Sequence, residues 1–300
     1  MIAKGEPVAL VLGAGGARGL AQIGVIEALQ ARGLAIDAVA GSSSGALVGG
    51  AFAAGRLDAL RDWFGAQRRN DFVRLMRLPE LGAGGLFDGH RLVQAMREVV
   101  GDPDIASLPV DFIAVAVDLL RQREVWLRSG PLWQAIRASF AIPGLFTPAL
   151  VNGRELVDGG LLAPLPITAT RLSDAHRLVA VDMHGWPERP AGRLADPAHA
   201  MHDGDKDGLA RWMRRQWRRT RPPTASEEDT EAGIGLTEIM SRSLDTMQAQ
   251  IARVQLALDP PELVIRIPRD ACLFYEFWRA GELIEIGRRE ADRALDAAGY

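Results

Sequence analysis

The chain has 300 residues, of which 48% are hydrophobic and 24% are charged, and its formal net charge is -3 at pH 7. This length accommodates one large α/β domain with a substantial core, and the nearly balanced charge argues against a nucleic-acid-binding protein. The single cysteine, Cys272, excludes an intrachain disulfide and lies in an apolar stretch, where a packing role is expected.

The first predicted elements are a buried strand at Val8–Leu12, a glycine-rich turn at Gly13–Gly19 and a helical stretch that runs to Arg32. A glycine-rich turn that enters a helix presents several free backbone N–H groups at one point. Such groups can hold a phosphate or the oxyanion of an acyl-transfer intermediate. The dinucleotide-binding pattern requires a third glycine where Arg18 stands, and its other register begins with an alanine. No P-loop lysine follows, so nucleotide binding is the weaker alternative.

A candidate nucleophile follows the second predicted strand, Ile36–Ala40. Gly41 and Gly45 enclose three serines in a G-x-S-x-G pattern, and the small residues Ala46–Gly55 are expected to form a helix. In a strand–turn–helix context this pattern exposes the middle serine, Ser43, while the glycines let two backbones pass closely. The N-terminus of the helix adds N–H donors and a partial positive charge. The pattern therefore predicts a serine nucleophile.

A candidate partner carboxylate, Asp158, lies further along the chain. Asn152-Gly153 is a strong hairpin-turn signal. Asp158 is expected at the end of the returning strand, followed by Gly159 and Gly160, where a carboxylate can meet another loop. An Asp-Gly pair taken alone is most often a plain turn.

The remaining predicted elements continue an alternation of strands and helices. They are strands at Val110–Val117, Glu124–Leu127, Arg177–Val181 and Leu263–Ile267, and helices at Ile234–Leu258 and Glu276–Ala298. This order predicts an α/β fold with a mainly parallel sheet and helices on both faces.

Taken together, these ordered motifs resemble the patatin-like phospholipase family. The resemblance is dense from residue 7 to residue 170, and Gly85–Gly89 and Ala138–Pro148 look like further signatures of the family. It implies a three-layer patatin-like fold and a catalytic dyad of Ser43 and Asp158. It also implies an oxyanion hole formed by the backbone of Gly15, Gly16 and Ala17, with Arg18 and Gly19 as supporting motif residues. The chain departs from the family pattern at Ala14, Gln22 and Ala163–Pro166.

The residues themselves leave two catalytic bases open. None of the five histidines lies in a recognisable catalytic motif, so either an unrecognised histidine completes a triad or Asp158 takes the proton from Ser43. An aspartate does this only when it is hydrogen-bonded to the serine and partly desolvated. We expect a serine lipid acyl hydrolase that acts through an acyl-enzyme on phospholipid or lysophospholipid esters, without cofactor or metal. A catalytically weak adaptor protein on the same fold is the alternative.

The expected domain organisation is a catalytic core at 7–170 and a continuation of the same domain at 171–300, which contains a flexible insertion at 185–232. Within the insertion, residues 209–219 form a predicted helix with aromatic residues on one side and arginines on the other. Such a helix suits peripheral contact with an anionic membrane surface. A helix packed on the core, with its arginines paired to the acidic block at 227–231, is the alternative.

The insertion also holds a sequence that imitates a calcium loop, at 203–214, but Arg214 occupies the position of its last ligand. No metal site is expected there. Because the N-terminus shows no signal-peptide pattern and no apolar run is long enough to span a membrane, we expect a cytoplasmic protein that is peripheral to the membrane at most.

Overall fold

The structure is a computed structural model and describes residues 2, 5–75, 85–87, 90–173, 175, 177–188 and 236–300. Met1–Glu188 and Leu244–Tyr300 form one compact unit, and Arg189–Ser243 form a second. The predicted helix at 209–219 and the calcium-like sequence at 203–214 lie outside the described residues, as does the insertion beyond residue 188. In the part of the chain that is described, no helix combines the length and the apolarity needed to cross a membrane.

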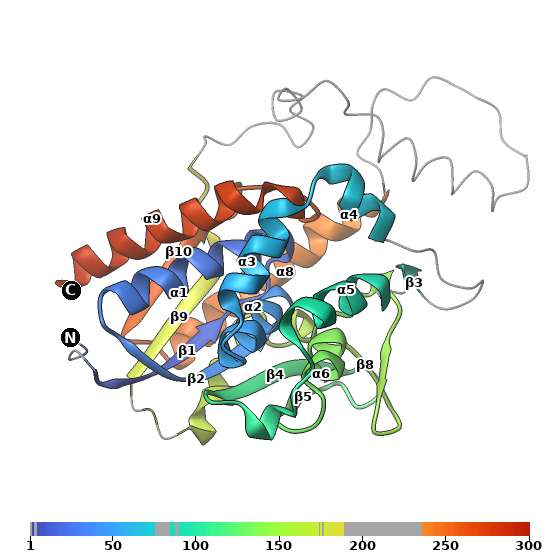
Figure 1. Ribbon diagram of the computed structural model, residues 1–300, viewed down its shortest axis with the longest axis horizontal. Coiled ribbons are helices and arrows are strands. Elements are labelled where there is room, and N and C mark those ends of the chain that lie inside the picture. The colour runs from blue at the N-terminus through green and yellow to red at the C-terminus, as the bar shows by residue number, and fades with distance from the viewer. Residues whose placement is uncertain are drawn as a thin grey trace, which may run out of the picture. The chain divides into compact units, whose positions relative to one another are not determined.

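A mixed sheet forms the centre of the first unit, with the strand order β10-β9-β1-β2-β4-β8-β7 (Figure 1). Its parallel part consists of β10 (Leu263–Pro268), β9 (Arg177–Gly185), β1 (Pro7–Leu12), β2 (Ala35–Ser42) and β4 (Asp111–Asp118). Their carboxyl ends lie at one edge of the sheet, as in other parallel α/β sheets, and ligands bind at this edge in such folds. These strands confirm the predicted α/β class.

The remaining strands of the sheet are antiparallel. They are β5 (Arg123–Leu127), β7 (Ala149–Val151) and β8 (Arg154–Asp158), and β4 pairs with both β5 and β8. Asn152 and Gly153 connect β7 to β8 with φ angles of 50° and 72°. Positive φ at both central residues is the requirement of a type I′ hairpin turn, which Asn-Gly satisfies. The predicted hairpin is thereby confirmed.

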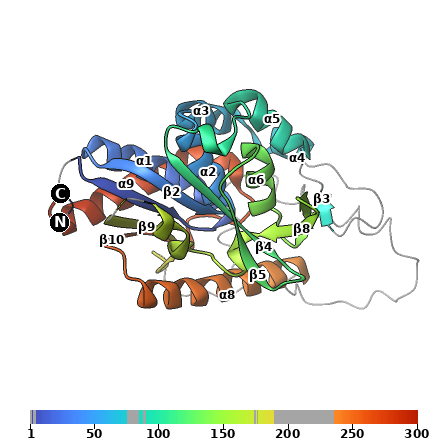
Figure 2. The ribbon, with the colours of Figure 1, turned by 90° about the horizontal axis from the view of Figure 1, so that it is seen from below.

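Helices cover both faces of the sheet (Figure 2). On one face lie α1 (Ala21–Ala31), α2 (Ser44–Ala53) and α9 (Ala280–Ala298), with α1 packed against α9. On the opposite face lies α8 (Leu236–Leu258), whose Ala252 packs with Val11 and Ala180 in a buried apolar cluster. The layered arrangement arises because strands that are buried on both faces need apolar cover on each.

The other elements surround this framework. They are η1 (Gly16–Leu20), α3 (Leu57–Ala66), α4 (Arg69–Leu75), α5 (His90–Val100), η2 (Ile105–Ser107), α6 (Leu132–Ser139), η3 (Gly159–Leu161) and η4 (Ile167–Leu172), together with a two-stranded sheet of β3 (Gly85–Phe87) and β6 (Gly144–Phe146).

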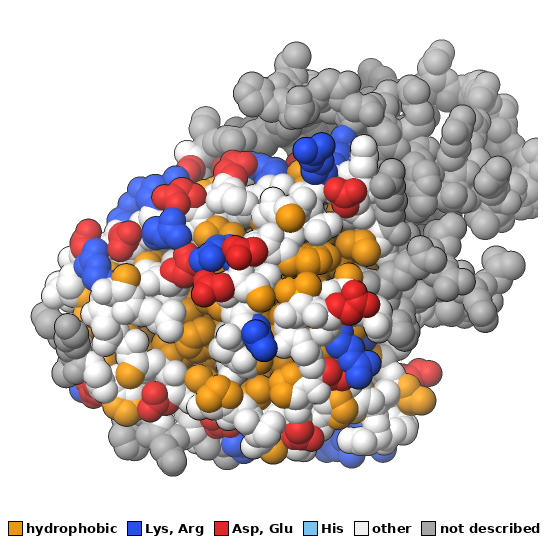
Figure 3. Space-filling view, in the orientation of Figure 1, with side chains coloured by type: hydrophobic (Ala, Val, Ile, Leu, Met, Phe, Trp, Pro, Cys, Tyr) orange, Lys and Arg blue, Asp and Glu red, His pale blue; other side chains and the backbone are white. Residues whose placement is uncertain are grey.

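The predicted C-terminal helix begins later than expected. The sequence predicted one helix from Glu276, but the structure has a short 3-10 helix, η6 (Phe277–Arg279), and α9 starts only at Ala280. Phe277 is buried and stacks on Phe72 with ring centroids 5.0 Å apart. Acidic and basic side chains alternate along the outer side of α9 (Figure 3), where Arg288 pairs with Glu285 one turn away. Such exposed pairs contribute little to stability.

Candidate active site

Ser43 occupies a strained turn between β2 and α2. Its backbone has φ 56° and ψ −122°, a conformation that non-glycine residues adopt rarely and that costs about 1–3 kcal/mol. The turn is tight, because a Cβ added at Gly45 would lie 2.1 Å from the carbonyl oxygen of Leu12 in β1. The same change at Gly41 would place its Cβ 2.5 Å from the backbone of Gly45. The predicted strand–turn–helix context of Ser43 is therefore present.

Ser139, at the end of α6, holds the backbone of Ser43. Its Oγ accepts a hydrogen bond from the N–H of Ser43 at 2.9 Å and donates one to the carbonyl of Val115 at 2.6 Å. Ser139 is completely buried. The sequence assigned no role to Ser139, although the Ala138–Pro148 signature that contains it was a signal that could have directed attention there.

The register of β4 brings Asp158 to the serine turn. Val115 pairs with Ser42 at the end of β2, and the next residue, Ala116, pairs with Asp158 at the end of β8. Residues 114–118 of β4 also pair with β5, which therefore occupies the opposite edge of the strand. Consequently β2 and β8 share one edge of β4 and meet end to end, with Ser43 and Asp158 at the junction.

Burial raises the pKa of the Asp158 carboxyl from 3.8 to about 7, although the Ser43 side chain and the N–H of Gly160 oppose this shift by hydrogen bonding. Gly160 donates its N–H to Oδ1 at 2.7 Å, and the N–H of Asp158 donates to the carbonyl of Ala141 at 2.9 Å. Oδ2 is buried and has no hydrogen-bond partner of normal geometry in the described part of the chain. This oxygen is thus available to accept a proton.

The glycine-rich segment after β1 is fixed by several backbone hydrogen bonds. Gly13 donates to Val181 at 3.1 Å and Ala14 donates to Pro164 at 2.8 Å. The N–H of Ala17 donates to the Phe274 carbonyl at 2.8 Å, so Ala17 is not a free donor in this conformation, contrary to the implied oxyanion role. The N–H groups of Gly15 and Gly16 have no partner among the described residues.

The other glycines of the predicted site mark close contacts between elements. A Cβ at Gly19 would lie 2.1 Å from Ser44 Oγ, and one at Gly159 would lie 2.1 Å from the Val115 carbonyl oxygen. Only glycine permits η1 to approach α2, and η3 to approach β4, at these distances. Gln22, which departs from the family pattern, donates from its amide to the carbonyl of Gly13 at 2.8 Å.

Arg18 is a buried residue of the glycine-rich segment, and its side chain connects this segment to neighbouring parts of the fold. Its guanidinium donates to the carbonyl of Arg269 at 2.7 Å and forms an ion pair with Asp245 of α8. Only 5% of the residue is exposed. These contacts agree with a role in fixing the glycine loop and leave no surface for a lipid head group.

The histidines do not contact the serine turn as far as they are described. His184 is the one histidine whose side chain is described, and it pairs with Asp182 and Asp245. The interactions that shift the pKa of Asp158 come from Ser43 and Gly160 and include no histidine. Over the described ranges, no group of three or more metal-ligating side chains comes together. The buried Cys272 is a free thiol whose pKa burial raises to about 12.

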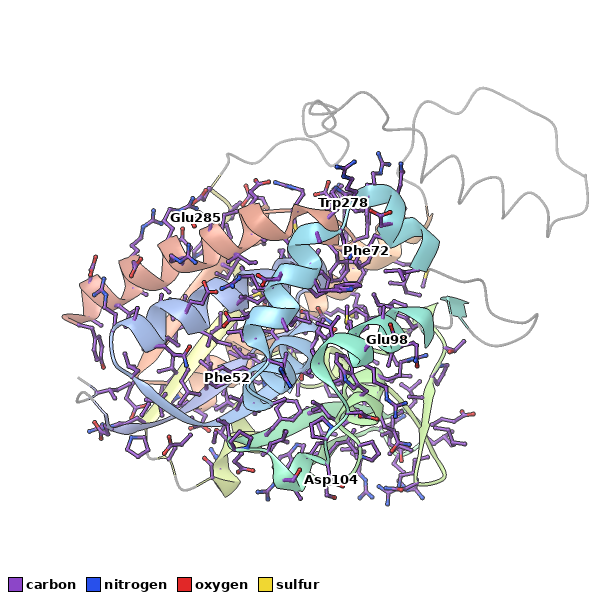
Figure 4. All side chains as sticks on the ribbon, viewed as in Figure 1. Phe52, Phe72, Glu98, Asp104, Trp278 and Glu285 are labelled. Atoms are coloured by element: carbon purple, nitrogen blue, oxygen red, sulfur yellow. The ribbon has the colours of Figure 1, made fainter. Side chains whose placement is uncertain are left out.

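An apolar hollow begins one helical turn from Ser43. Leu47 of α2, whose N–H donates to the carbonyl of Ser43 at 3.1 Å, lines it together with Ile136 of α6 and Phe140 just after that helix. Phe72 of α4 and Phe277 of η6 also line it, with ring centroids 5.0 Å apart, and Phe72 and Trp278 are labelled in Figure 4. The hollow has a volume of about 10 Å³, which is room for one water molecule and not for an acyl chain.

The chain is similar to several known proteins. The family model for patatin-like phospholipase matches residues 10–171. An uncharacterized NTE family protein of Mycobacterium tuberculosis is 37% identical over 330 residues, which span 97% of this chain and 91% of that protein. Lysophospholipase nte1 of Emericella nidulans is 32% identical over 187 residues, 60% of this chain and 12% of that protein. The structure of VipD from Legionella pneumophila matches with a TM-score of 0.45 and 14% identity, covering 99% of this chain and 67% of that one.

Proposed function

This chain belongs to the patatin-like phospholipase family, and we propose that it is a serine lipid acyl hydrolase that cleaves carboxylic esters of phospholipids or lysophospholipids. The observation that carries this proposal is the junction of β2 and β8, where a strained serine meets a buried carboxyl with a pKa of about 7. Perturbed carboxyl groups beside a nucleophile are typical of active sites.

In the proposed acylation step, Ser43 Oγ attacks the ester carbonyl carbon while Asp158 takes the hydroxyl proton. A base with a pKa near the working pH is the most effective, and the value of about 7 meets this condition. The negative charge that develops on the carbonyl oxygen is stabilised by the N–H groups of Gly15 and Gly16. The C–O bond to the alcohol then breaks, and Asp158 returns the proton to the leaving oxygen.

The resulting acyl-enzyme is released by water. Asp158 takes a proton from the water as its oxygen attacks the acyl carbon, and the same two N–H groups receive the charge. When the bond to Ser43 breaks, the proton passes from Asp158 to Ser43 Oγ, and a fatty acid leaves. The cycle needs no other proton carrier.

Two observations support a lipid as the acyl donor. The family model that matches residues 10–171 is that of a patatin-like phospholipase. A relative that matches 60% of this chain is named a lysophospholipase. The adaptor alternative is less favoured, because a strained Ser43 and a buried Asp158 with a raised pKa bring an inactive protein no benefit. Contact of residues 209–219 with an anionic membrane stays a prediction.

The test combines a serine-directed fluorophosphonate with a lipid assay. The wild-type protein should be labelled and should release fatty acid from lysophosphatidylcholine, measured by mass spectrometry, whereas Ser43→Ala should do neither. Labelling that persists in Ser43→Ala, or a wild-type protein that neither reacts nor hydrolyses lipid esters, would overturn the proposal.

A further inference from the structure

A cluster of ionisable groups outside the proposed dyad contacts the glycine-rich segment Gly13–Gly19 through Arg18. Arg18 of η1, His184 of β9 and Asp245 of α8 meet there, although 227 residues separate Arg18 from Asp245. His184 Nε2 lies 3.6 Å from Asp245 Oδ1, and His184 Nδ1 lies 3.4 Å from Asp182 Oδ1. The side chains of Arg18, Asp182 and His184 are more than nine-tenths buried. The proposed reaction uses none of them.

This cluster is coupled to the proposed oxyanion donors through the backbone. Arg18 follows Gly15 and Gly16 by two to three residues, and its guanidinium is held by Asp245 and by the Arg269 carbonyl. Met183 lies between Asp182 and His184 in β9, and a Cβ added at Gly15 would lie 2.7 Å from the Met183 side chain. Movement of Arg18 or of the end of β9 would therefore displace both N–H groups.

Two arginines, Arg18 and Arg266 of β10, act on the two carboxylates Asp245 and Asp182, and His184 lies between these carboxylates. Cys272 also lies near Arg18, and its thiol stays neutral because burial raises its pKa to about 12. The pKa of His184 is raised: burial lowers it, but the nearby carboxylates of Asp182 and Asp245 prevail. The pKa values of both carboxyls are lowered despite desolvation, by His184 in both cases and by Arg18 beside Asp245.

We propose that Asp245, through Arg18, and His184, through Met183, are positioning residues that hold the Gly15 and Gly16 N–H groups in place for the developing oxyanion. This inference rests on the proposed hydrolase function. Loss of the proton from His184 removes its ion pair with Asp245 of α8 and so loosens the end of β9, which carries Met183 against Gly15. Because the donors act in the transition state, the effect falls on kcat and leaves KM unchanged.

The direction in which kcat changes with pH follows from the protonation states that Asp158 and His184 need. Asp158 must lose its proton to act as a base, so kcat rises as the pH increases through its range. His184 must keep its proton, so kcat falls as the pH increases through the raised pKa of His184. A bell-shaped profile is expected, in which the acid limb belongs to Asp158 and the alkaline limb belongs to His184.

The experiment compares His184→Gln and Asp245→Asn with the wild type, using a small soluble ester and rates normalised by titration with a fluorophosphonate. Asp259→Asn is the matched control, because it removes an exposed ion pair with Arg171 just after the end of the same helix. Each cluster variant should lower kcat per titrated site about tenfold to a hundredfold without changing KM. His184→Gln should also remove the alkaline limb while it keeps the acid limb, and Asp259→Asn should match the wild type.

A second readout does not depend on turnover. The amide resonances of Gly15 and Gly16 should titrate with His184 in the wild type and lose that titration in His184→Gln. An unchanged alkaline limb in His184→Gln, a wild-type profile without that limb, or Gly15 and Gly16 amides that do not respond to pH would each overturn the inference. Failure of the proposed function is recognised separately, by an absence of hydrolysis that depends on Ser43.

Discussion

Ser43 donates its backbone N–H to Ser139 Oγ at 2.9 Å, and Ser139 Oγ in turn donates a hydrogen bond to the Val115 carbonyl of β4. A side chain from α6 thus fixes the strained backbone of the proposed nucleophile to the central strand of the site. Ala141, two residues later, accepts the N–H of Asp158 at 2.9 Å. One short segment therefore positions both members of the proposed dyad.

Removal of this hydroxyl is expected to weaken both the turn and the reaction. Ser139→Ala leaves the buried N–H of Ser43 without its partner, which should cost about 1–3 kcal/mol of stability and lower kcat. Denaturant unfolding and steady-state kinetics measure the two effects. Ser173→Ala is the control, because Ser173 Oγ bonds only to the Thr170 carbonyl three residues earlier. Equal effects of the two substitutions would contradict the positioning role.

The three adjacent serines should differ sharply when each is replaced by alanine. Ser43→Ala should abolish ester hydrolysis with the fold intact. Ser42→Ala removes a bond to the Ala163 carbonyl and Ser44→Ala removes a buried hydroxyl without a partner, so both should keep substantial activity. Rates on a soluble ester measure the activity of each variant, and circular dichroism checks that the variant is folded. Turnover in Ser43→Ala above a trace would mean that another group is the nucleophile.

The proposed base is tested by Asp158→Asn, which keeps the shape of the side chain but cannot accept the proton. Its activity should fall about as far as that of Ser43→Ala, since the two residues act as a unit. In the wild type, kcat/KM should rise as the pH increases through about 7, where Asp158 loses its proton. No single histidine substitution should match this loss. A histidine variant as inactive as Asp158→Asn would replace the dyad with a triad.

The same substitution should stabilise the protein at alkaline pH. A carboxyl whose pKa is raised on folding from 3.8 to about 7 loses stability as the pH rises between these values, because the buried charge is disfavoured. Asp158→Asn should therefore be more stable than the wild type at pH 8, by about 4 kcal/mol at most, and nearly equal to it at pH 4. Thermal unfolding at the two pH values measures the difference. A variant that is less stable at pH 8 would show that Asp158 is not destabilised by burial.

The close contact at Gly45 should not tolerate a methyl group. Gly45→Ala forces the start of α2 away from the Leu12 carbonyl and should cost about 1–3 kcal/mol or more. Gly65→Ala, in α3, is the matched control, because a Cβ there meets no atom within 4 Å. Its stability should be unchanged or slightly higher, since alanine favours a helix. Urea unfolding of both variants is the measurement, and a tolerated Gly45→Ala would contradict the close approach.

Several features of the site could be predicted from the sequence because they are local. Strand, G-x-S-x-G and helix follow one another within about twenty residues, so the turn at Ser43 depends on neighbours in the chain. The Asn152-Gly153 turn and the strand that ends at Asp158 are local in the same sense. The alternation of strands and helices was sufficient to predict the α/β class, because each element carries its own apolar pattern.

Only the tertiary structure decided how these pieces meet. Asp158 lies beside Ser43 because consecutive residues of β4 pair with the ends of β2 and β8, and no local pattern specifies that register. The engagement of Ala17 by Phe274, and of Arg18 by Asp245, joins segments more than two hundred residues apart. Hydrogen bonds and ion pairs of this kind depend on how the sheet and its helices pack. The sequence therefore determined which groups are proposed to carry the chemistry, and packing determined their distances, their partners and the pKa of Asp158.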